Sequence, residues 1–264
     1  MKKLIHKSDL VKVIGKDNVF TRALASVAMG VLGVNKINRL YSPSAHLSDY
    51  PFTEHMLDVY GITYDKNETE MNVIPKEGPF IIVSNHPFGA IEGIILYNAI
   101  ARIRPDFKVM ANFILSYIPN LKDVFIPVNP FADNPEWGSS IGGIKTAMHH
   151  ISQGNGLGIF PAGEVSRYYG DSQRPVDLDW AVTIAKLVKK SAVPVIPVYF
   201  DGMNSKRFYR LAKIHSMLAT NGGSSYIRCF GCLGQPTCYG HHLCILGRYT
   251  YFQYYTLRFV VYSI

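Results

Sequence analysis

Five short runs of apolar residues, separated by segments with helical patterns, limit how this chain can fold more than any other feature. The runs are residues 80–83, 107–110, 124–128, 157–160 and 193–200, and the helical segments include 91–103, 141–151 and 180–189. Strands that alternate with helices predict a parallel sheet. Because the runs are apolar at successive positions, both faces of these strands should be covered. The sequence therefore predicts an α/β fold, a mainly parallel sheet flanked by helices.

The region before these runs, residues 1–47, has a helical pattern. Asp17 and Asn18 are placed to cap a helix that contains the apolar stretch 23–34. This stretch is shorter than the roughly 20 residues that a membrane-spanning helix needs. Charged residues soon after Met1 also interrupt any signal-peptide pattern. We therefore expect an N-terminal helical segment that associates with a membrane surface, followed by an α/β domain over residues 48–215.

The composition changes abruptly after residue 215. Residues 216–264 contain no Asp, Glu or Lys, although they hold all four cysteines of the chain, Cys229, Cys232, Cys238 and Cys244. Four thiolates can hold a zinc ion, but their irregular spacing makes zinc the less favoured interpretation. We expect an atypical Cys- and Tyr-rich tail without a metal, and a shifted reading frame after about Ser216 would explain its composition.

One stretch, SNHPFGAIEG at residues 84–93, joins the first apolar run to the helical segment that follows it. An α/β fold places its chemistry at such carboxyl ends of strands. His86 lies on the predicted turn, and Glu92 lies in the first helical turn. An imidazole can take the proton of an alcohol, while a carboxylate behind it orients the ring and stabilises its charged form. The alternative is a purely structural pair that ends the strand and starts the helix.

The order Asn85-His86 followed by a carboxylate resembles the first motif of the glycerolipid acyltransferases. That motif has a histidine, four intervening residues and an aspartate, whereas here five residues separate His86 from Glu92. The stretch NHPFGAIEG is most similar to a bacterial, haemolysin-like branch that includes O-acyltransferases of amino-acid lipids. The resemblance implies that His86 and Glu92 are catalytic.

A second turn, GIFPAGEVSR at residues 158–167, resembles the third motif of this family, which helps to bind the polar head of the acceptor. Ala162 stands where the family has a glutamate. Ser166 and Arg167 supply a hydroxyl and a cation suited to a phosphate or carboxylate, and Glu164 either replaces the missing acid in part or pairs with Arg167. The substrate-binding residues implied by both motifs are Asn85, Phe160, Pro161, Gly163, Glu164, Ser166 and Arg167.

The resemblance implies an O-acyltransferase that moves a fatty acyl group from a thioester to the hydroxyl of a lysolipid. The acceptor would be a lysophospholipid or a lyso-amino-acid lipid, and the donor would be acyl carrier protein or coenzyme A. Because a thioester is already activated, no tightly bound cofactor or metal is expected. We expect a peripheral or monotopic protein at the cytoplasmic face of the membrane. The net charge of +8 suits an anionic surface, and no aromatic pattern for binding nucleic acid accompanies it.

Two other functions remain open from the sequence. Residues 138–142 match the G-x-S-x-G pattern of serine esterases and lipases, with Ser140 as the nucleophile. That motif needs a strand directly before the serine, whereas a loop-like stretch precedes Ser140. The other alternative is a non-enzymatic lipid-binding or haemolysin-like protein, which would use the N-terminal helices and the basic residues Lys206, Arg210 and Lys213.

Overall fold

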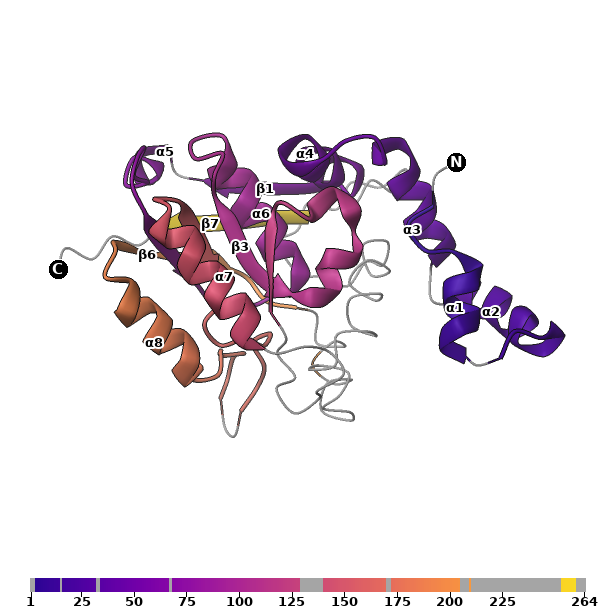
Figure 1. The fold of residues 1–264 in the computed structure, drawn as a ribbon. Helices are drawn as coiled ribbons and strands as arrows, with labels where there is room; N and C mark the ends of the chain where they lie inside the picture. Colours follow the sequence, from indigo (N-terminus) through magenta and orange to yellow (C-terminus); the bar gives the residue numbers. More distant parts are fainter. Residues whose placement is uncertain are drawn as a thin grey trace.

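A seven-stranded sheet forms the centre of the structure, a computed structural model, with helices on both faces and a helical arm to one side (Figure 1). The structure describes residues 3–14, 16–31, 34–66, 68–128, 140–169, 172–204, 209 and 253–259. The predicted fold class is confirmed.

The strands follow the order β1-β7-β6-β2-β5-β3-β4 across the sheet. All neighbouring pairs are parallel except β6 with β7, which is antiparallel. The strands are β1 (Ile62–Lys66), β2 (Phe80–Ser84), β3 (Lys108–Asn112), β4 (Phe125–Val128), β5 (Gly156–Ile159), β6 (Val195–Asp201) and β7 (Gln253–Phe259). The five predicted runs thus form β2 to β6, a continuous parallel block, whereas β1 and β7 were not predicted. Since β7 lies in the predicted tail, that region adds a strand to the same sheet.

Helices cover both faces of the parallel block. Successive side chains of β2 point to opposite faces of the sheet and so belong to different hydrophobic clusters. Phe80 and Ile82 belong to the first cluster, which α4 (Asp49–Val59) and α6 (Ala90–Ala101) complete. Ile81 and Val83 belong to the second cluster, which α7 (Ser140–Ser152) and α8 (Val182–Ser191) complete. The prediction of strands buried on both faces is confirmed for β2 and β5, whereas β3, β4 and β6 are only partly buried.

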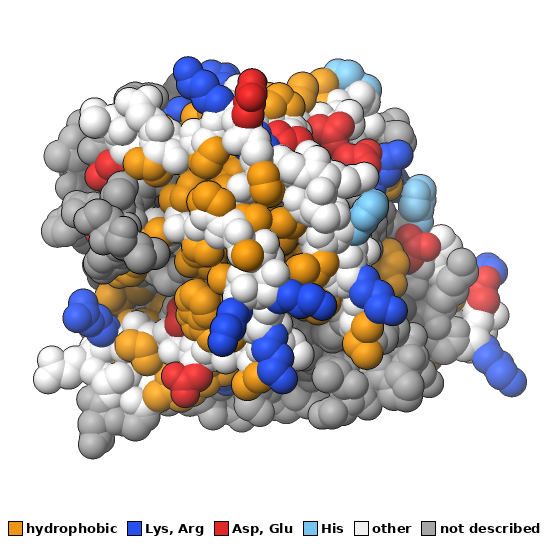
Figure 2. All heavy atoms as spheres, turned by 60° about the vertical axis from the view of Figure 1, so that its left-hand side comes forward, with side chains coloured by type: hydrophobic (Ala, Val, Ile, Leu, Met, Phe, Trp, Pro, Cys, Tyr) orange, Lys and Arg blue, Asp and Glu red, His pale blue; other side chains and the backbone are white. Residues whose placement is uncertain are grey.

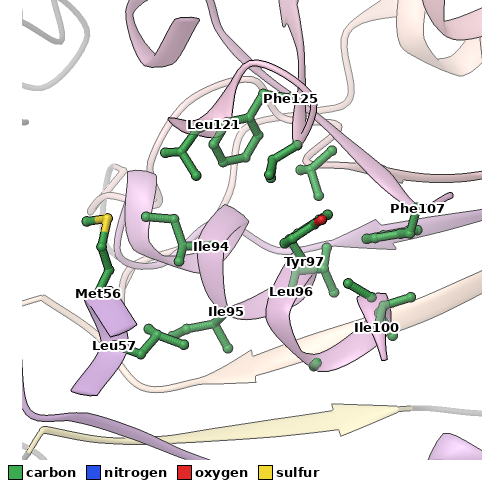
Figure 3. Packing of buried hydrophobic residues seen from close by; sticks show 14 of the residues in the cluster. Met56, Leu57, Ile94, Ile95, Leu96, Tyr97, Ile100, Phe107, Leu121 and Phe125 are labelled. Atoms are coloured by element: carbon green, nitrogen blue, oxygen red, sulfur yellow. The ribbon is translucent and has the colours of Figure 1, made fainter. Parts of the chain in front are cut away.

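Helix α6 is buried on every side from Glu92 to its end. Figure 3 shows its residues Ile94, Ile95, Leu96, Tyr97 and Ile100 among hydrophobic side chains from other elements. Those labelled are Met56 and Leu57 of α4, Phe125 of β4, Leu121 and Phe107. A helix that is hydrophobic all round is typical of such a position. Its first turn therefore lies inside the protein, and Glu92 is buried with it.

The N-terminal arm consists of α1 (Lys7–Ile14), α2 (Val19–Val31) and α3 (Val34–Tyr41). Asn18 caps α2 as predicted: its Oδ1 accepts a hydrogen bond from the N–H of Thr21 at 2.9 Å, and Thr21 Oγ1 accepts from the N–H of Asn18 at 3.0 Å. Within the described ranges, no helix combines the length and apolarity needed to cross a membrane. The other short elements are α5 (Glu68–Met71), η1 (Ser42–Ser44), η2 (Phe113–Tyr117) and η3 (Pro119–Leu121).

Strand β6 is fully packed on one face only. Ile196, Val198 and Phe200 are buried, whereas Val195 and Tyr199 on the opposite face remain 37% and 44% exposed. Figure 2, which brings the left-hand side of Figure 1 forward, shows hydrophobic side chains gathered on this side of the molecule, with lysine and arginine side chains below them. Apolar surface therefore continues onto the outside of the protein here.

A buried ionic cluster lies at the amino-terminal ends of the parallel strands. The Arg104 side chain is 5% exposed and forms two bonds to the Asp106 carboxylate, at 2.8 and 2.7 Å. Its remaining bonds go to the carbonyl oxygens of Pro75, Gly78 and Gly154. Asp106 also accepts from the N–H of Gly156 at 2.8 Å, and His150 Nε2 lies 3.1 Å from the Gly156 oxygen. The cluster therefore joins the starts of β2, β3 and β5 to α7.

His150 should make stability depend on pH, because burial lowers its pKa. In the unfolded chain the ring gains a proton near its ordinary pKa of about 6.5, whereas the folded protein resists protonation, so acid favours unfolding. We expect the free energy of unfolding to fall between about pH 7 and pH 5, and to fall less in His150→Gln. Urea unfolding at the two pH values measures this, and an equal fall in both proteins would contradict it.

Candidate active site

The two sequence motifs meet because three neighbouring parallel strands end at the same edge of the sheet. His86 follows β2, Phe160 follows β5, and β6 ends beside them at Asp201. This edge is where open α/β sheets carry their ligands. The order β6-β2-β5 thus brings together residues that lie far apart in the sequence.

His86 and Glu92 form the pair that the first motif predicted. Nδ1 of His86 lies 3.4 Å from Oε1 of Glu92, and the glutamate side chain is fully buried. The same Oε1 accepts a hydrogen bond from the N–H of Phe88 at 2.5 Å. The turn between strand and helix requires Gly89, whose φ of 112° is poorly tolerated by other residues. The five intervening residues therefore bring the longer glutamate side chain back to the ring.

The ring of His86 is held so that one nitrogen faces inward. Nδ1 is buried and makes no hydrogen bond among the described residues, so its 3.4 Å approach to Glu92 is a close contact. The ring stacks on Phe160 with centroids 4.6 Å apart, while 13% of the side chain remains exposed. Nε2 is therefore the nitrogen left for a substrate. Phe160, a residue of the second motif, packs against the predicted base itself.

Asp177, which the sequence analysis did not single out, joins the two turns. Its Oδ2 and Oδ1 lie 3.1 and 3.3 Å from the N–H of His86, and its Oδ1 accepts a short hydrogen bond from the Ser166 hydroxyl. The N–H of Ser166 donates to the carbonyl oxygen of His86 at 2.8 Å. Ser166 itself is only 5% exposed. Because its hydroxyl donates to Asp177, Oγ can only accept a hydrogen bond from a ligand.

Arg167 is the cation of the second motif and is partly exposed, with 23% of its side chain accessible. It pairs with Glu164 through a short contact, and its Nε donates to the Tyr169 hydroxyl at 2.7 Å. Of the two roles expected for Glu164, pairing with Arg167 is the one present. The guanidinium is therefore held in place, with its charge partly balanced.

Pro161 and Gly163 shape the second turn. The N–H of Gly163 donates to the Phe160 oxygen at 3.0 Å, and Gly163 has a φ of 70°, in the left-handed region. The carbonyl oxygen of Pro161 accepts from the N–H of Ala181 at 3.1 Å. These backbone bonds connect the turn to the segment that carries Asp177.

Asn85 extends the sheet by one side chain. Its Nδ2 donates to the Phe200 oxygen at 2.9 Å, and its Oδ1 accepts from the Phe200 N–H at 2.7 Å. Asn204 plays a similar part, since its Nδ2 donates to the Pro87 oxygen at 2.9 Å. Both amides tie the end of β6 to the turn of His86. The first motif implied a substrate-binding role for Asn85, whereas no sequence signal pointed to Asn204.

The remaining sequence hypotheses fall on other parts of the chain. The four tail cysteines and the basic residues Lys206, Arg210 and Lys213 lie outside the described residues. In the part of the chain that is described, no three His, Cys, Asp or Glu side chains gather as a metal site would require. Ser140 is the first residue of α7, and the nearest described strand before it ends at Val128. Residues 129–139, which directly precede Ser140, lie outside the described residues, so the strand that a serine nucleophile needs there stays untested.

Comparison with known proteins agrees with the two motifs. A family model described as "Acyltransferase" matches residues 20–223. The chain belongs to this acyltransferase family. The resemblance predicted from the motifs is confirmed. The family match ends close to the change of composition at residue 216, although the domain boundaries stay a prediction.

The curated relatives are bacterial enzymes named lyso-glycine lipid O-acyltransferase. The chain is 29% identical to that of Phocaeicola vulgatus and 30% identical to that of Bacteroides thetaiotaomicron, in each case over 142 residues and 53% of this chain. These matches cover 48% and 50% of the relatives, so the chain spans about half their length. Among solved structures it is similar to the 1-acyl-sn-glycerophosphate (LPA) acyltransferase PlsC from Thermotoga maritima. That match has a TM-score of 0.35 and 17% identity, and it covers 62% of this chain and 65% of the other.

Asn85 should matter for stability more than for binding. We expect Asn85→Ala to lower the free energy of unfolding by about 1–3 kcal/mol, because the buried backbone groups of Phe200 lose their partners. Urea unfolding measures this effect. If Asn85→Ala instead left stability unchanged and raised the KM for a lysolipid acceptor, a direct substrate contact would be the better explanation.

Proposed function

We propose that this protein transfers a fatty acyl group from an acyl thioester to the hydroxyl of a lysolipid, with His86 as the general base. One observation carries the chemical part of the proposal: Nδ1 of His86 faces the buried carboxylate of Glu92 at 3.4 Å. This leaves Nε2 to accept a proton. Family membership and the names of the curated relatives support the reaction and the acceptor class.

The burial of Glu92 favours the transition state over the ground state. Oε2 has no hydrogen-bond partner among the described residues, and the side chain is fully buried. A buried negative charge without a full set of partners is costly. When His86 gains a proton, the imidazolium at 3.4 Å compensates this charge. Because the compensation arises only as the proton moves, it stabilises the transition state selectively.

The reaction proceeds in two stages. In the first, Nε2 of His86 takes the hydroxyl proton of the lysolipid while the hydroxyl oxygen attacks the thioester carbonyl carbon, and a tetrahedral oxyanion forms. In the second, the carbon–sulfur bond breaks, and the departing thiolate receives the proton from Nε2. The products are the ester and the free thiol, and the imidazole is neutral again. The proton taken from the hydroxyl ends on the thiol, and no atom changes its oxidation state. The scheme therefore needs no metal or redox cofactor of its own.

Two carboxylates already accept hydrogen bonds from N–H groups of the turn, and these N–H groups are therefore not free to stabilise the oxyanion. The N–H of His86 is directed to Asp177 and that of Phe88 to Glu92, while Pro87 has no N–H. The remaining candidates are the first N–H groups of α6, beginning at Gly89. These groups lie at a helix amino terminus, where N–H groups are free of helical partners and the helix dipole favours negative charge.

Arg167 is the group we assign to the anionic head of the acceptor. Its partly exposed guanidinium offers planar donors that match a carboxylate or a phosphate. Ser166 contributes mainly by holding the turn, since its proton goes to Asp177. We expect the donor to be acyl carrier protein or coenzyme A, and the acceptor to be an amino-acid lysolipid like those of the relatives or a lysophospholipid.

Replacing the base tests the chemistry. We expect His86→Ala to lower kcat by about 10²–10⁴-fold, and Glu92→Gln to lower it strongly as well, because the imidazolium loses its counter-charge. The assay follows labelled acyl thioester into lipid by chromatography and mass spectrometry. His149→Ala, which changes an exposed histidine, should leave the rate unchanged. Acyl transfer at the wild-type rate in His86→Ala would refute the mechanism, whereas loss of activity in Ser140→Ala alone would favour the esterase.

We further propose that α2 binds the membrane surface. Phe20, Leu24 and Val27 are spaced to lie along one side of this helix and are 75%, 44% and 62% exposed, whereas Thr21, Ala25 and Met29 face inward. Exposed apolar side chains in a row are typical of helices that lie in a lipid interface. Lys16 just before the helix suits anionic lipid, whereas the charge of Arg22 is balanced by Asp17, to which it donates two hydrogen bonds.

The double variant Phe20→Glu/Leu24→Glu should bind vesicles of phosphatidylglycerol and phosphatidylethanolamine about tenfold or more weakly, since charge is driven into the apolar side of α2. Vesicle sedimentation measures the binding. Ser26→Glu is the matched control: it adds one charge to the same helix on another side, next to Arg22, and should bind nearly as wild type. Equal losses in both would indicate a general charge effect and contradict the proposal.

A further inference from the structure

Residues 176–181 form a segment between the turn of residues 160–167 and helix α8. Val176, Leu178 and Trp180 are exposed by 41%, 36% and 48%, whereas Asp177 between them is half-buried and turns toward His86. From Val176 to Leu178 the side chains thus alternate between outside and inside, as expected of extended backbone, whereas Asp179 is exposed. Both ends of the segment are fixed, because Val176 pairs with Arg167 and Ala181 bonds to Pro161.

The backbone of His86 is held on both sides by this region. Asp177 takes the N–H of His86, and Ser166 donates its own N–H to the carbonyl oxygen of His86. The Ser166 hydroxyl then closes a loop by donating to Asp177. Hydrogen bonds to a carboxylate are stronger than those between neutral groups. One side chain, 91 residues from His86 in sequence, thus joins the base to the acceptor turn.

We infer that Asp177 is a positioning residue, which sets the distance between His86 and the turn of residues 160–167. This inference rests on the proposed role of His86 as general base. Asp177 contacts the main chain of His86 and the hydroxyl of Ser166, so its effect on the reaction passes through their placement. A shift of about 1 Å at such a base costs up to about 10²-fold in rate.

Two variants separate position from charge. In Asp177→Asn one carbonyl oxygen remains to accept from the His86 N–H and the Ser166 hydroxyl, as Oδ1 does at present. In Asp177→Ala both bonds are lost. Asp179→Asn is the matched control, because Asp179 lies on the same segment and is exposed. We expect kcat to fall about 10- to 100-fold in Asp177→Ala, with the acceptor KM changed less than about threefold. Asp177→Asn should recover most of the rate.

The stacking of His86 on Phe160 gives a readout that does not depend on activity. At a centroid distance of 4.6 Å the aromatic ring shifts the NMR resonances of the His86 ring protons. Comparison with the spectrum of His86→Gln assigns these resonances. They should move toward ordinary histidine values in Asp177→Ala and stay in place in Asp177→Asn and Asp179→Asn.

The outcomes are distinct. Displaced His86 resonances in Asp177→Ala together with recovery in Asp177→Asn support the inference. The inference is overturned if Asp177→Ala leaves the resonances and kcat unchanged, or if this variant only lowers the melting temperature. It is also overturned if Asp177→Asn is as inactive as Asp177→Ala, because the charge of Asp177 and not its position would then matter. If the wild type makes no acyl product but the resonances move as expected, the proposed reaction fails while Asp177 still positions His86.

Discussion

The complete burial of the Glu92 carboxylate is the constraint around which this site is built. Helix α6 is buried from Glu92 to its end, so a charge on Glu92 must find its partners inside the protein. The N–H of Phe88 donates a hydrogen bond to this carboxylate, and Nδ1 of His86 lies 3.4 Å from it without a hydrogen bond among the described residues. In the reaction we propose, protonation of the ring would compensate this charge, as the role of a general base requires.

A second carboxylate, that of Asp177, fixes the position of His86 relative to the turn of residues 160–167. Asp177 and Ser166 hold the backbone of His86 from its two sides, and Phe160 packs on the ring. Glu92 therefore acts on the imidazole and Asp177 on the main chain that carries it. Together they occupy the N–H groups of His86 and Phe88. In the reaction we propose, the start of α6 would therefore face the developing negative charge.

Local patterns predicted the parts of the fold that are buried on both faces. The runs that became β2 to β6 are apolar at successive positions, a signal that polar neighbours do not dilute. Strand β1 escaped prediction because Thr63, Asp65 and Lys66 make the half-exposed sequence ITYDK look like a loop. Strand β7 escaped because its pairing with β1 and β6 depends on residues far away in the chain. Asp177 lies in an alternating stretch, VDLDW, whose apolar and acidic residues indicate extended backbone but not what the acid contacts.

By itself the sequence determined the strand–turn–helix unit with His86 and Glu92, because these residues are close enough in the chain for local geometry to bring them together. It also determined the family, through the two motifs. The strand order of the sheet decided the rest: it placed the ends of β6, β2 and β5 side by side and so brought Phe160, Ser166 and Asp177 to His86. The tertiary structure also gave Asn85 its partner, the backbone of Phe200. Such contacts depend on hydrogen bonds and burial between distant segments, which no local pattern encodes.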